Sequence, residues 1–156
     1  MGRRKTETHL KMGLCVSLIN LKTLVMHAEN FSYTPIAKEI KSAEEATTET
    51  KSFGRCVVCF TAIEEEDENK QELAERFVEQ IKLALKEVGE NTLILYPFVH
   101  LTDKPAKPSV ALRIIKTLKE RVSASGVHVE SAPFGWNKKF SITIFGHPLA
   151  ERSFRF

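Results

Sequence analysis

A lysine placed among aromatic residues is the strongest chemical signal in this sequence. Lys138 lies in the segment Ala132-Pro-Phe-Gly-Trp-Asn-Lys-Lys-Phe140, which is typical of a turn followed by a strand, and the carboxylate of Glu151 follows about one strand and one turn later. A lysine that is partly removed from water can have a lowered pKa or can serve as a positioned cation. The segment therefore predicts a chemical site, and the alternative is a plain hairpin whose lysine is solvated.

A histidine at the end of a predicted strand is the second candidate. His100 belongs to the segment Tyr96-Pro-Phe-Val-His-Leu101, in which Pro97 removes a backbone donor and stiffens the exit from the strand. Ligands of crossover sheets collect where strands end and loops begin. We therefore expect His100 to face Lys138 across a cleft, unless it is simply a hydrogen-bonded structural residue. The other histidines are weaker candidates: His27, His128 and His147.

Two amphipathic helices must position these residues. Apolar residues recur at helical spacing over 73–88, and Gly89 suits the position after the helix end. Pro108 suits the first turn of a second helix, which Gly126 ends. Strands are predicted at 21–27, 55–63, 91–96, 127–131 and 139–145. We interpret residues 28–54 as loop and hairpin, and Glu64–Glu68 as a solvated acidic connection.

The order of these elements predicts an α/β fold. Strands alternate with the helices from 55 to 131, and right-handed crossovers make such neighbouring strands parallel. A chain of 156 residues fits one domain with a buried core. We expect a single sheet with two crossover helices over residues 21–156, and a poorly ordered extension at 1–20.

Composition sets the broad class of partner and compartment. The net charge of +3 permits an anionic partner without requiring one. An odd number of cysteines without secretory context favours the reducing cytoplasm. Cys56 and Cys59 have redox-motif spacing but lie in a strand, where positions three apart face opposite sides, so we expect buried structural thiols. No segment is apolar enough to span a membrane. No spacing predicts a metal site or a cofactor motif.

Several uncommon short motifs occur in an order that resembles a known family. The sequence from about Leu21 to Glu151 resembles the N-terminal editing domain of archaeal-type threonyl-tRNA synthetase, whose fold is similar to that of D-aminoacyl-tRNA deacylases. The motifs that carry the resemblance are Leu24-Val-Met-His27, Tyr96-Pro-Phe-Val-His-Leu101, Lys107-Pro-Ser109, Ala132-Pro-Phe-Gly-Trp136, Lys138, Phe140 and Gly146-His-Pro-Leu-Ala-Glu151.

The resemblance implies an ester hydrolase that removes serine from the 3′ end of tRNA(Thr) and spares threonyl-tRNA(Thr). It implies that Lys138 contacts the substrate and helps to place the attacking water, that His100 lies beside the pocket, and that Glu151 orients the site near the lysine. It further implies a homodimer and a partnership with the catalytic and anticodon-binding parts of a synthetase, in cis or in trans. The substrate-binding residues that it implies are Ile63, Pro97, Phe98, Val99, Trp136 and Asn137.

Two departures from the family pattern leave alternatives open. Asn137 stands where the family usually has tyrosine, and Val99 stands where a small residue is common. Asparagine can hydrogen-bond but provides no aromatic wall, and valine narrows the pocket. One alternative is a D-aminoacyl-tRNA deacylase, although the cross-subunit motif that rejects L-amino acids in that family is not evident here. Another is a non-catalytic tRNA-binding module with a decayed site.

Overall fold

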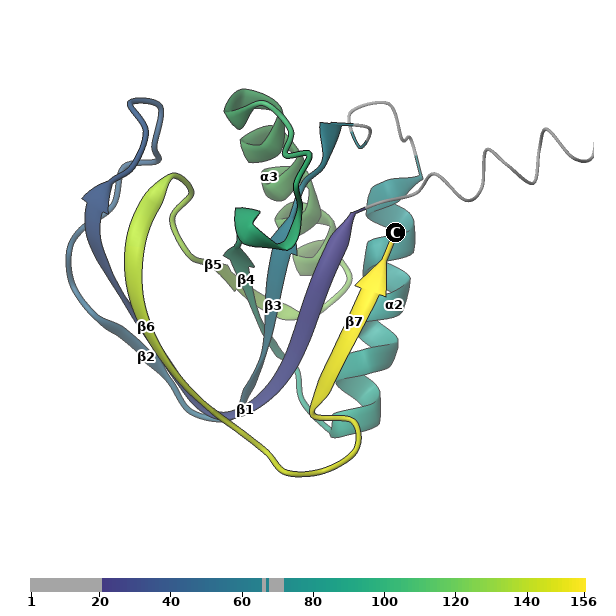
Figure 1. The fold of residues 1–156 in the computed structure, drawn as a ribbon. Helices are drawn as coiled ribbons and strands as arrows, with labels where there is room; N and C mark the ends of the chain where they lie inside the picture. Colours follow the sequence, from purple (N-terminus) through teal and green to yellow (C-terminus); the bar gives the residue numbers. More distant parts are fainter. Residues whose placement is uncertain (1–20, 66, 68–71) are drawn as a thin grey trace, which may run out of the picture.

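One long strand organises the sheet of this protein. The computed structural model describes residues 21–65, 67 and 72–156. Strand β1 (Lys22–Lys38) pairs antiparallel with four strands: β3 (Cys56–Ala62) and β7 (Glu151–Arg155) along its first half, and β2 (Lys51–Phe53) and β6 (Trp136–Ile144) along its second half. The two halves therefore belong to different parts of a curled sheet, in which β2 and β6 bend away from the helices (Figure 1).

The two predicted crossovers are confirmed. Strand β3 connects through helix α2 (Leu73–Val88) to β4 (Thr92–Pro97), and β4 connects through helix α3 (Pro108–Ala124) to β5 (His128–Ser131). Both strand pairs are parallel, in the order β3-β4-β5. Gly89 ends α2 with a left-handed φ of 72°, and Pro108 begins α3, as the sequence predicts. A short 3₁₀ helix, η2 (Val99–Leu101), lies between β4 and α3.

The prediction of loop and hairpin over 28–54 is wrong for its first part. Strand β1 continues to Lys38, and only β2 and the connection to it match the predicted hairpin. The register shifts between Ala28 and Asn30, and again beside Pro35, which is tolerated because a bulge needs no ladder donor. A one-residue shift exchanges the two faces of a strand, which hides the strand from a simple alternation rule. Strand β7 was likewise not predicted.

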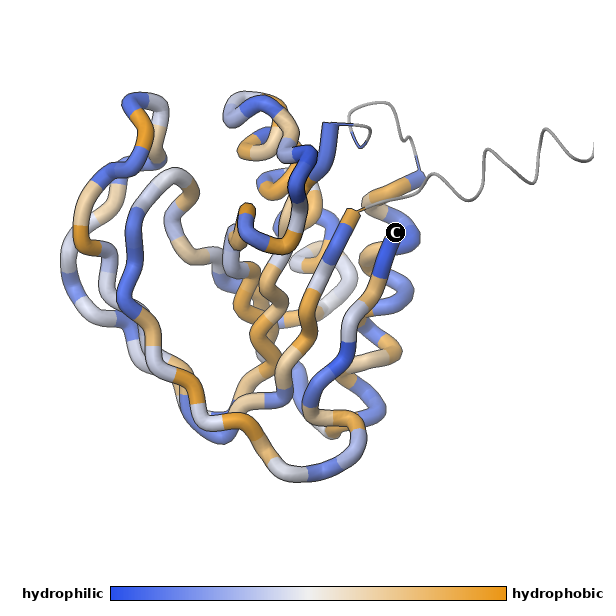
Figure 2. The backbone as a smooth tube through the Cα atoms, viewed as in Figure 1, coloured by the Kyte–Doolittle hydropathy of each residue, from blue (hydrophilic) through white to orange (hydrophobic). Residues whose placement is uncertain are grey.

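Two apolar cores lie on opposite faces of the sheet. On one face, Leu21 and Val25 pack beneath the helices together with Cys59. On the other face, Phe31 and Tyr33 pack together with Cys56. The two thiols are free and buried on opposite faces, as predicted. Burial raises the pKa of Cys56 to about 11 and that of Cys59 to about 12. Figure 2 shows the hydrophobic residues gathered along the central strands.

The acidic run after β3 is not a simple solvated connection. Glu64 is 5% exposed, forms an ion pair with Lys22 at 3.3 Å and accepts a hydrogen bond from the Thr102 hydroxyl at 3.0 Å. Asp67 is also buried, and its carboxylate accepts the Glu64 amide at 2.7 Å. These bonds tie the end of β3 to the loop after η2. Residues 66 and 68–71 of this region, like the extension predicted at 1–20 with its Cys15, lie outside the described residues.

None of the helices in the described part of the chain has the length and apolar character needed to cross a membrane. His128, one of the weaker candidates, is exposed.

Candidate active site

A cavity of about 390 Å³ lies between the end of β4, the start of α3 and the start of β6. All but one of the site residues named from the sequence line it: Ile63, Pro97, Phe98, Val99, His100, Trp136, Asn137 and Lys138. They come together because the end of β4 and the start of β6 lie on the same side of the curled sheet. Glu151 does not line this cavity.

Lys138 is held in place by the turn that precedes β6. Its ammonium group donates hydrogen bonds to the carbonyl oxygens of Pro133 at 2.9 Å and Trp136 at 3.0 Å. It also lies 5.0 Å from the centre of the Tyr96 ring, a favourable position for a cation. The lysine is therefore not the freely solvated group of a plain hairpin.

The environment of Lys138 lowers its pKa to about 8 from an ordinary value of 10.5. Burial is the largest cause, because desolvation disfavours the charged amine. The carboxylates of Glu39 and Glu44 oppose this effect and raise the pKa. Near pH 8 the side chain is thus available both as a cation and as a neutral amine.

Aromatic rings form one wall of the cavity. The ring centres of Tyr96 and Phe140 lie 5.4 Å apart, and the ring of Phe98 meets that of His100 edge-on at 5.2 Å. His100 itself is exposed, on η2. Burial raises the pKa of Tyr96 to about 12, so its phenol stays protonated beside the lysine. The wall is apolar with few polar groups, as expected for a small-molecule pocket.

The part of the cavity rim formed by the ends of β3 and β4 is fixed by backbone hydrogen bonds. The Phe98 amide donates to the Thr61 carbonyl at 2.8 Å, and the Ala106 amide donates to the Ile63 carbonyl at 2.9 Å. These bonds dock the loop that carries η2 onto the end of β3. His100 is thereby held over the cavity although its own side chain is exposed.

The expectation that Glu151 lies near Lys138 is wrong within this chain. Lys138 is opposite Pro35 on β1, whereas Glu151 is exposed and opposite Met26. At about 3.4 Å per residue, these two points lie roughly 30 Å apart along β1. The physical reason is that β6 and β7 pair with different halves of the same strand.

Sequence patterns do not identify the two carboxylates near Lys138 as site residues. Glu39 lines the cavity, and Glu44 contacts the turn before β6 through hydrogen bonds. Both follow β1 in a polar stretch interpreted as loop, and no motif distinguishes them from neighbouring glutamates. Only the pairing of β1 with β6, a long-range contact, brings them to the site. Among the described residues, no set of three His, Cys, Asp or Glu side chains could hold a metal ion.

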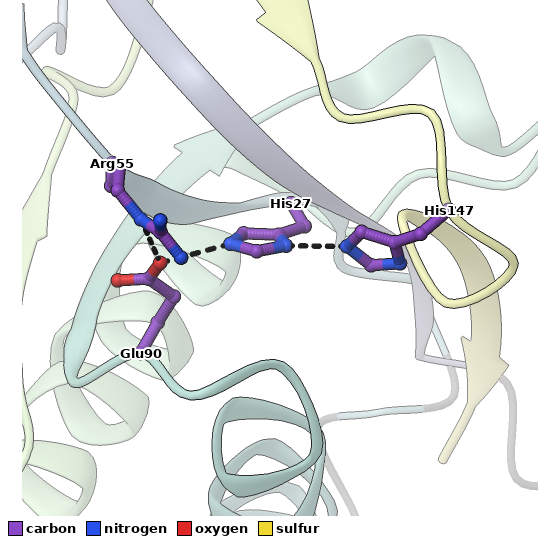
Figure 3. Close-up of polar contacts among 4 residues, drawn as sticks. All are labelled: His27, Arg55, Glu90 and His147. Carbon is purple, nitrogen blue, oxygen red and sulfur yellow. Dashed lines mark hydrogen bonds and ion pairs between the residues drawn. The ribbon is translucent and has the colours of Figure 1, made fainter.

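A second polar cluster involves histidines outside the cavity (Figure 3). The buried His27 contacts His147 through Nδ1 at 2.7 Å and Glu90 through Nε2 at 3.0 Å. Glu90 also accepts a hydrogen bond from Arg55 at 2.8 Å. The Leu149 amide donates to Nδ1 of His147 at 3.1 Å. The cluster therefore ties β1 to the β6–β7 connection and to the turn after α2.

Comparison with known proteins places this chain in a family. A family model described as the archaea-specific editing domain of threonyl-tRNA synthetase matches residues 21–155. The chain is similar to the threonine–tRNA ligase of Thermofilum pendens, with 37% identity over 85% of this chain and 22% of the relative. It is also similar to the threonine–tRNA ligase of Nitrosopumilus maritimus, with 39% identity over 85% of this chain and 21% of the relative. The chain thus spans about a fifth of these synthetases.

A shorter relative and a solved structure agree with this placement. The threonine–tRNA ligase editing subunit of Saccharolobus solfataricus is 36% identical over 85% of this chain and 33% of its own length. A solved structure of a probable eukaryotic D-amino acid tRNA deacylase has a TM-score of 0.63 at 11% identity, and covers 88% of this chain and 100% of its own. The latter confirms the predicted deacylase-like fold. The chain belongs to the archaeal threonyl-tRNA synthetase editing-domain family.

Proposed function

We propose that this chain hydrolyses the ester of L-serine wrongly attached to tRNA(Thr) and spares threonyl-tRNA(Thr), as the editing module of a threonyl-tRNA synthetase. The observation that carries the proposal is the amine of Lys138, held by two carbonyl groups at the wall of a cavity of about 390 Å³. Family membership supplies the substrate class. The cavity is of a size that suits the aminoacyl end of a tRNA.

The hydrogen bonds of Lys138 indicate what the amine can do. An ammonium group has three donors, and two of them are used by Pro133 and Trp136. The third remains for the substrate, where it can stabilise the negative charge that develops on the ester oxygen during attack by water. In the neutral form the two donors are used and the lone pair is available to orient that water. His100 acts from the opposite rim.

The cavity offers no activated hydroxyl or thiol among its described lining residues. The hydroxyl of Thr61 is buried and donates to the Cys59 carbonyl at 3.2 Å, and burial raises the pKa of the Tyr96 phenol to about 12. Direct attack by water, assisted by the terminal ribose hydroxyl of the tRNA, is therefore the mechanism that we propose. A covalent intermediate on the protein is not part of it.

The need for such a site follows from the small difference between serine and threonine. A missing methyl group changes binding by only about 1–3 kcal/mol, or roughly 10–200-fold, which limits discrimination in a single pocket. A second, hydrolytic site supplies the remaining selectivity. Val99, which is half-exposed on the rim, narrows the entrance, and Asn137 offers a cavity-lining amide that can hydrogen-bond where the family usually presents an aromatic side chain.

Deacylation assays test this proposal directly. Purified protein is incubated with seryl-tRNA(Thr) and threonyl-tRNA(Thr), and the remaining ester is measured over time. We expect seryl-tRNA to be lost and threonyl-tRNA to survive, and Lys138→Ala to lower the rate by about 100-fold or more. Lys139→Ala, at the exposed neighbouring lysine, is the matched control. Equal survival of both esters with folded protein, or full activity of Lys138→Ala, would contradict the proposal.

The fold supports one other candidate, a D-aminoacyl-tRNA deacylase. The observation in its favour is the likeness to the solved deacylase structure, which shows the fold alone. Assays with D- and L-aminoacyl esters of the same tRNA separate the two activities. Binding of tRNA with no loss of any ester would instead indicate a non-catalytic module.

We also propose the assembly in which the domain works. The tRNA(Thr) 3′ end enters the cavity, and the catalytic and anticodon-binding parts of a synthetase act in cis or in trans in the cytoplasm, where tRNA is charged. Among the described strands β5 pairs with β4 alone, and such sheet edges favour self-association. Sedimentation analysis at several concentrations tests the homodimer, and a monomer at all concentrations would exclude it.

A further inference from the structure

The segment that follows β1 lies against the turn that holds Lys138. The amides of Glu39 and Ile40 both donate to the Gly135 carbonyl, at 2.8 and 3.4 Å. Gly135 has a φ of 82°, and a Cβ atom there would lie 2.9 Å from atoms of Ala43 and Ile40. This close approach shows that the segment and the turn are packed together without space for a side chain between them.

Glu44 makes three hydrogen bonds to this turn. Its carboxylate accepts the Phe134 amide at 3.0 Å, and its own amide donates to the Phe134 carbonyl at 3.0 Å. Its carbonyl accepts the indole N–H of Trp136 at 2.7 Å. One residue thereby fixes both the middle and the end of the turn, and only the first of these bonds uses the side chain.

The same turn supplies both carbonyl groups that bind Lys138. Pro133 and Trp136, the two acceptors, flank Phe134 and Gly135. The Phe134 amide that donates to the Glu44 carboxylate belongs to the same planar peptide unit as the Pro133 carbonyl, so this hydrogen bond fixes the direction of that carbonyl. The bond from the Trp136 indole to the Glu44 carbonyl holds the residue whose own carbonyl is the second acceptor. A change at Glu44 is therefore transmitted to the lysine through the backbone.

We propose that Glu44 is a positioning residue for Lys138, which clamps the Pro133–Trp136 turn so that the two carbonyl groups hold the amine at the cavity. This inference rests on the proposed deacylase function for its kinetic consequence, but the placement of the amine can be measured separately. Glu44 does not line the cavity and acts through the turn.

The charge of Glu44 adds a second effect on the same amine. The groups that face Lys138 are the carboxylates of Glu39 and Glu44, the ring of Tyr96 and, across the cavity, His100. Both carboxylates raise the lysine pKa against the larger effect of burial. Removing the charge of Glu44 therefore lowers the pKa of Lys138 below about 8.

Three variants separate hydrogen bonding from charge and from nonspecific effects. Glu44→Gln keeps an oxygen that can accept the Phe134 amide, whereas Glu44→Ala removes it. Glu45→Ala is the matched control, because Glu45 is exposed and pairs only with Lys38 among the described residues. We expect Glu44→Ala to lower kcat for seryl-tRNA on the order of 10-fold to 100-fold with little change in KM, and Glu44→Gln to restore most of this loss.

A measurement without substrate gives the decisive readout. The rate at which Lys138 reacts with acetic anhydride, followed by mass spectrometry across pH, reports the fraction of neutral amine. We expect a midpoint near pH 8 in the wild type, a lower midpoint in Glu44→Gln, which loses only the charge, and no change in Glu45→Ala. Glu44→Ala should have a higher midpoint than Glu44→Gln, because loss of the clamp also returns the amine to solvent.

The two readouts distinguish the two proposals. If Glu44→Ala and Glu44→Gln give the same labelling profile, only the charge of Glu44 acts on the amine, and the positioning role is overturned even when the protein hydrolyses seryl-tRNA. If the two profiles differ but the wild type hydrolyses no seryl-tRNA, the deacylase function fails while Glu44 still positions the amine. A kcat loss in Glu44→Ala that merely follows its unfolded fraction, without rescue by Glu44→Gln, also overturns the proposal.

Discussion

Replacing Lys138 with methionine should change how the stability of the protein depends on pH. Methionine keeps most of the length of the side chain but carries no titrating amine and makes no bond to Pro133 or Trp136. Burial lowers the lysine pKa to about 8 in the folded state, whereas in the unfolded chain it returns to its ordinary value of 10.5. Between these values the unfolded state binds more protons, so the free energy of unfolding rises with pH.

The size of the effect follows from the two pKa values. The difference is 2.5 units, from 10.5 to about 8, and each unit corresponds to 1.36 kcal/mol, which gives an upper value of about 3 kcal/mol. Lys138 keeps part of its surface in water, and solvent screening reduces this figure to about 1–2 kcal/mol. The contribution is present above pH 10.5 and is lost as the pH falls through 8.

Urea unfolding at intervals from pH 7 to 10.5 measures this effect. The free energy of unfolding of the wild type, minus that of Lys138→Met, should rise by about 1–2 kcal/mol over this range. Taking the difference removes other groups that titrate in the same range. Lys139→Met should follow the wild type, because that side chain is exposed. Parallel curves for the wild type and Lys138→Met would show that the amine is not desolvated, and the reasoning about the site would fail.

Three further predictions concern other parts of the fold. Gly135→Ala should lower the free energy of unfolding by at least about 2 kcal/mol, because the left-handed φ of Gly135 and the distance of 2.9 Å from a Cβ there to Ala43 both oppose a side chain. Calorimetry measures this loss, and an unchanged melting temperature contradicts it. His27→Ala should destabilise the protein by about 2–4 kcal/mol in urea while leaving the labelling profile of Lys138 unchanged, and a shifted profile would show that the two clusters are coupled. In a Cys15→Ser background, the two buried thiols of β3 should react with a thiol reagent only at the rate of unfolding, and fast reaction in the native state would contradict their burial.

The parts of the fold that could be predicted are those set by local patterns. Helix α2 is confirmed because its apolar residues repeat at helical spacing up to Gly89, whose left-handed conformation ends the helix. The parallel strands β3, β4 and β5 are confirmed because continuous apolar runs alternate with these helices. Such signals lie within short windows of sequence and need no knowledge of distant contacts.

The parts that could not be predicted depend on contacts between distant segments. The second half of β1 contains Pro35, and it pairs with β2 and, across two irregularities, with β6, strands that lie far from it in the sequence. Glu44 reaches the turn before β6 for the same reason. Glu151 shows the reverse error, since the family resemblance implied a place near Lys138, whereas the two residues lie opposite different halves of β1.

The histidine cluster in Figure 3 has a direction, and this limits what can replace its members. The Leu149 amide donates a hydrogen bond to Nδ1 of His147, so that ring carries its proton on Nε2 and donates to Nδ1 of His27. His27 in turn carries its proton on Nε2 and donates to Glu90. Each ring thus accepts a hydrogen bond on one nitrogen and donates one from the other. A side chain that can only donate or only accept hydrogen bonds would break one of these bonds and leave two donors or two acceptors facing each other.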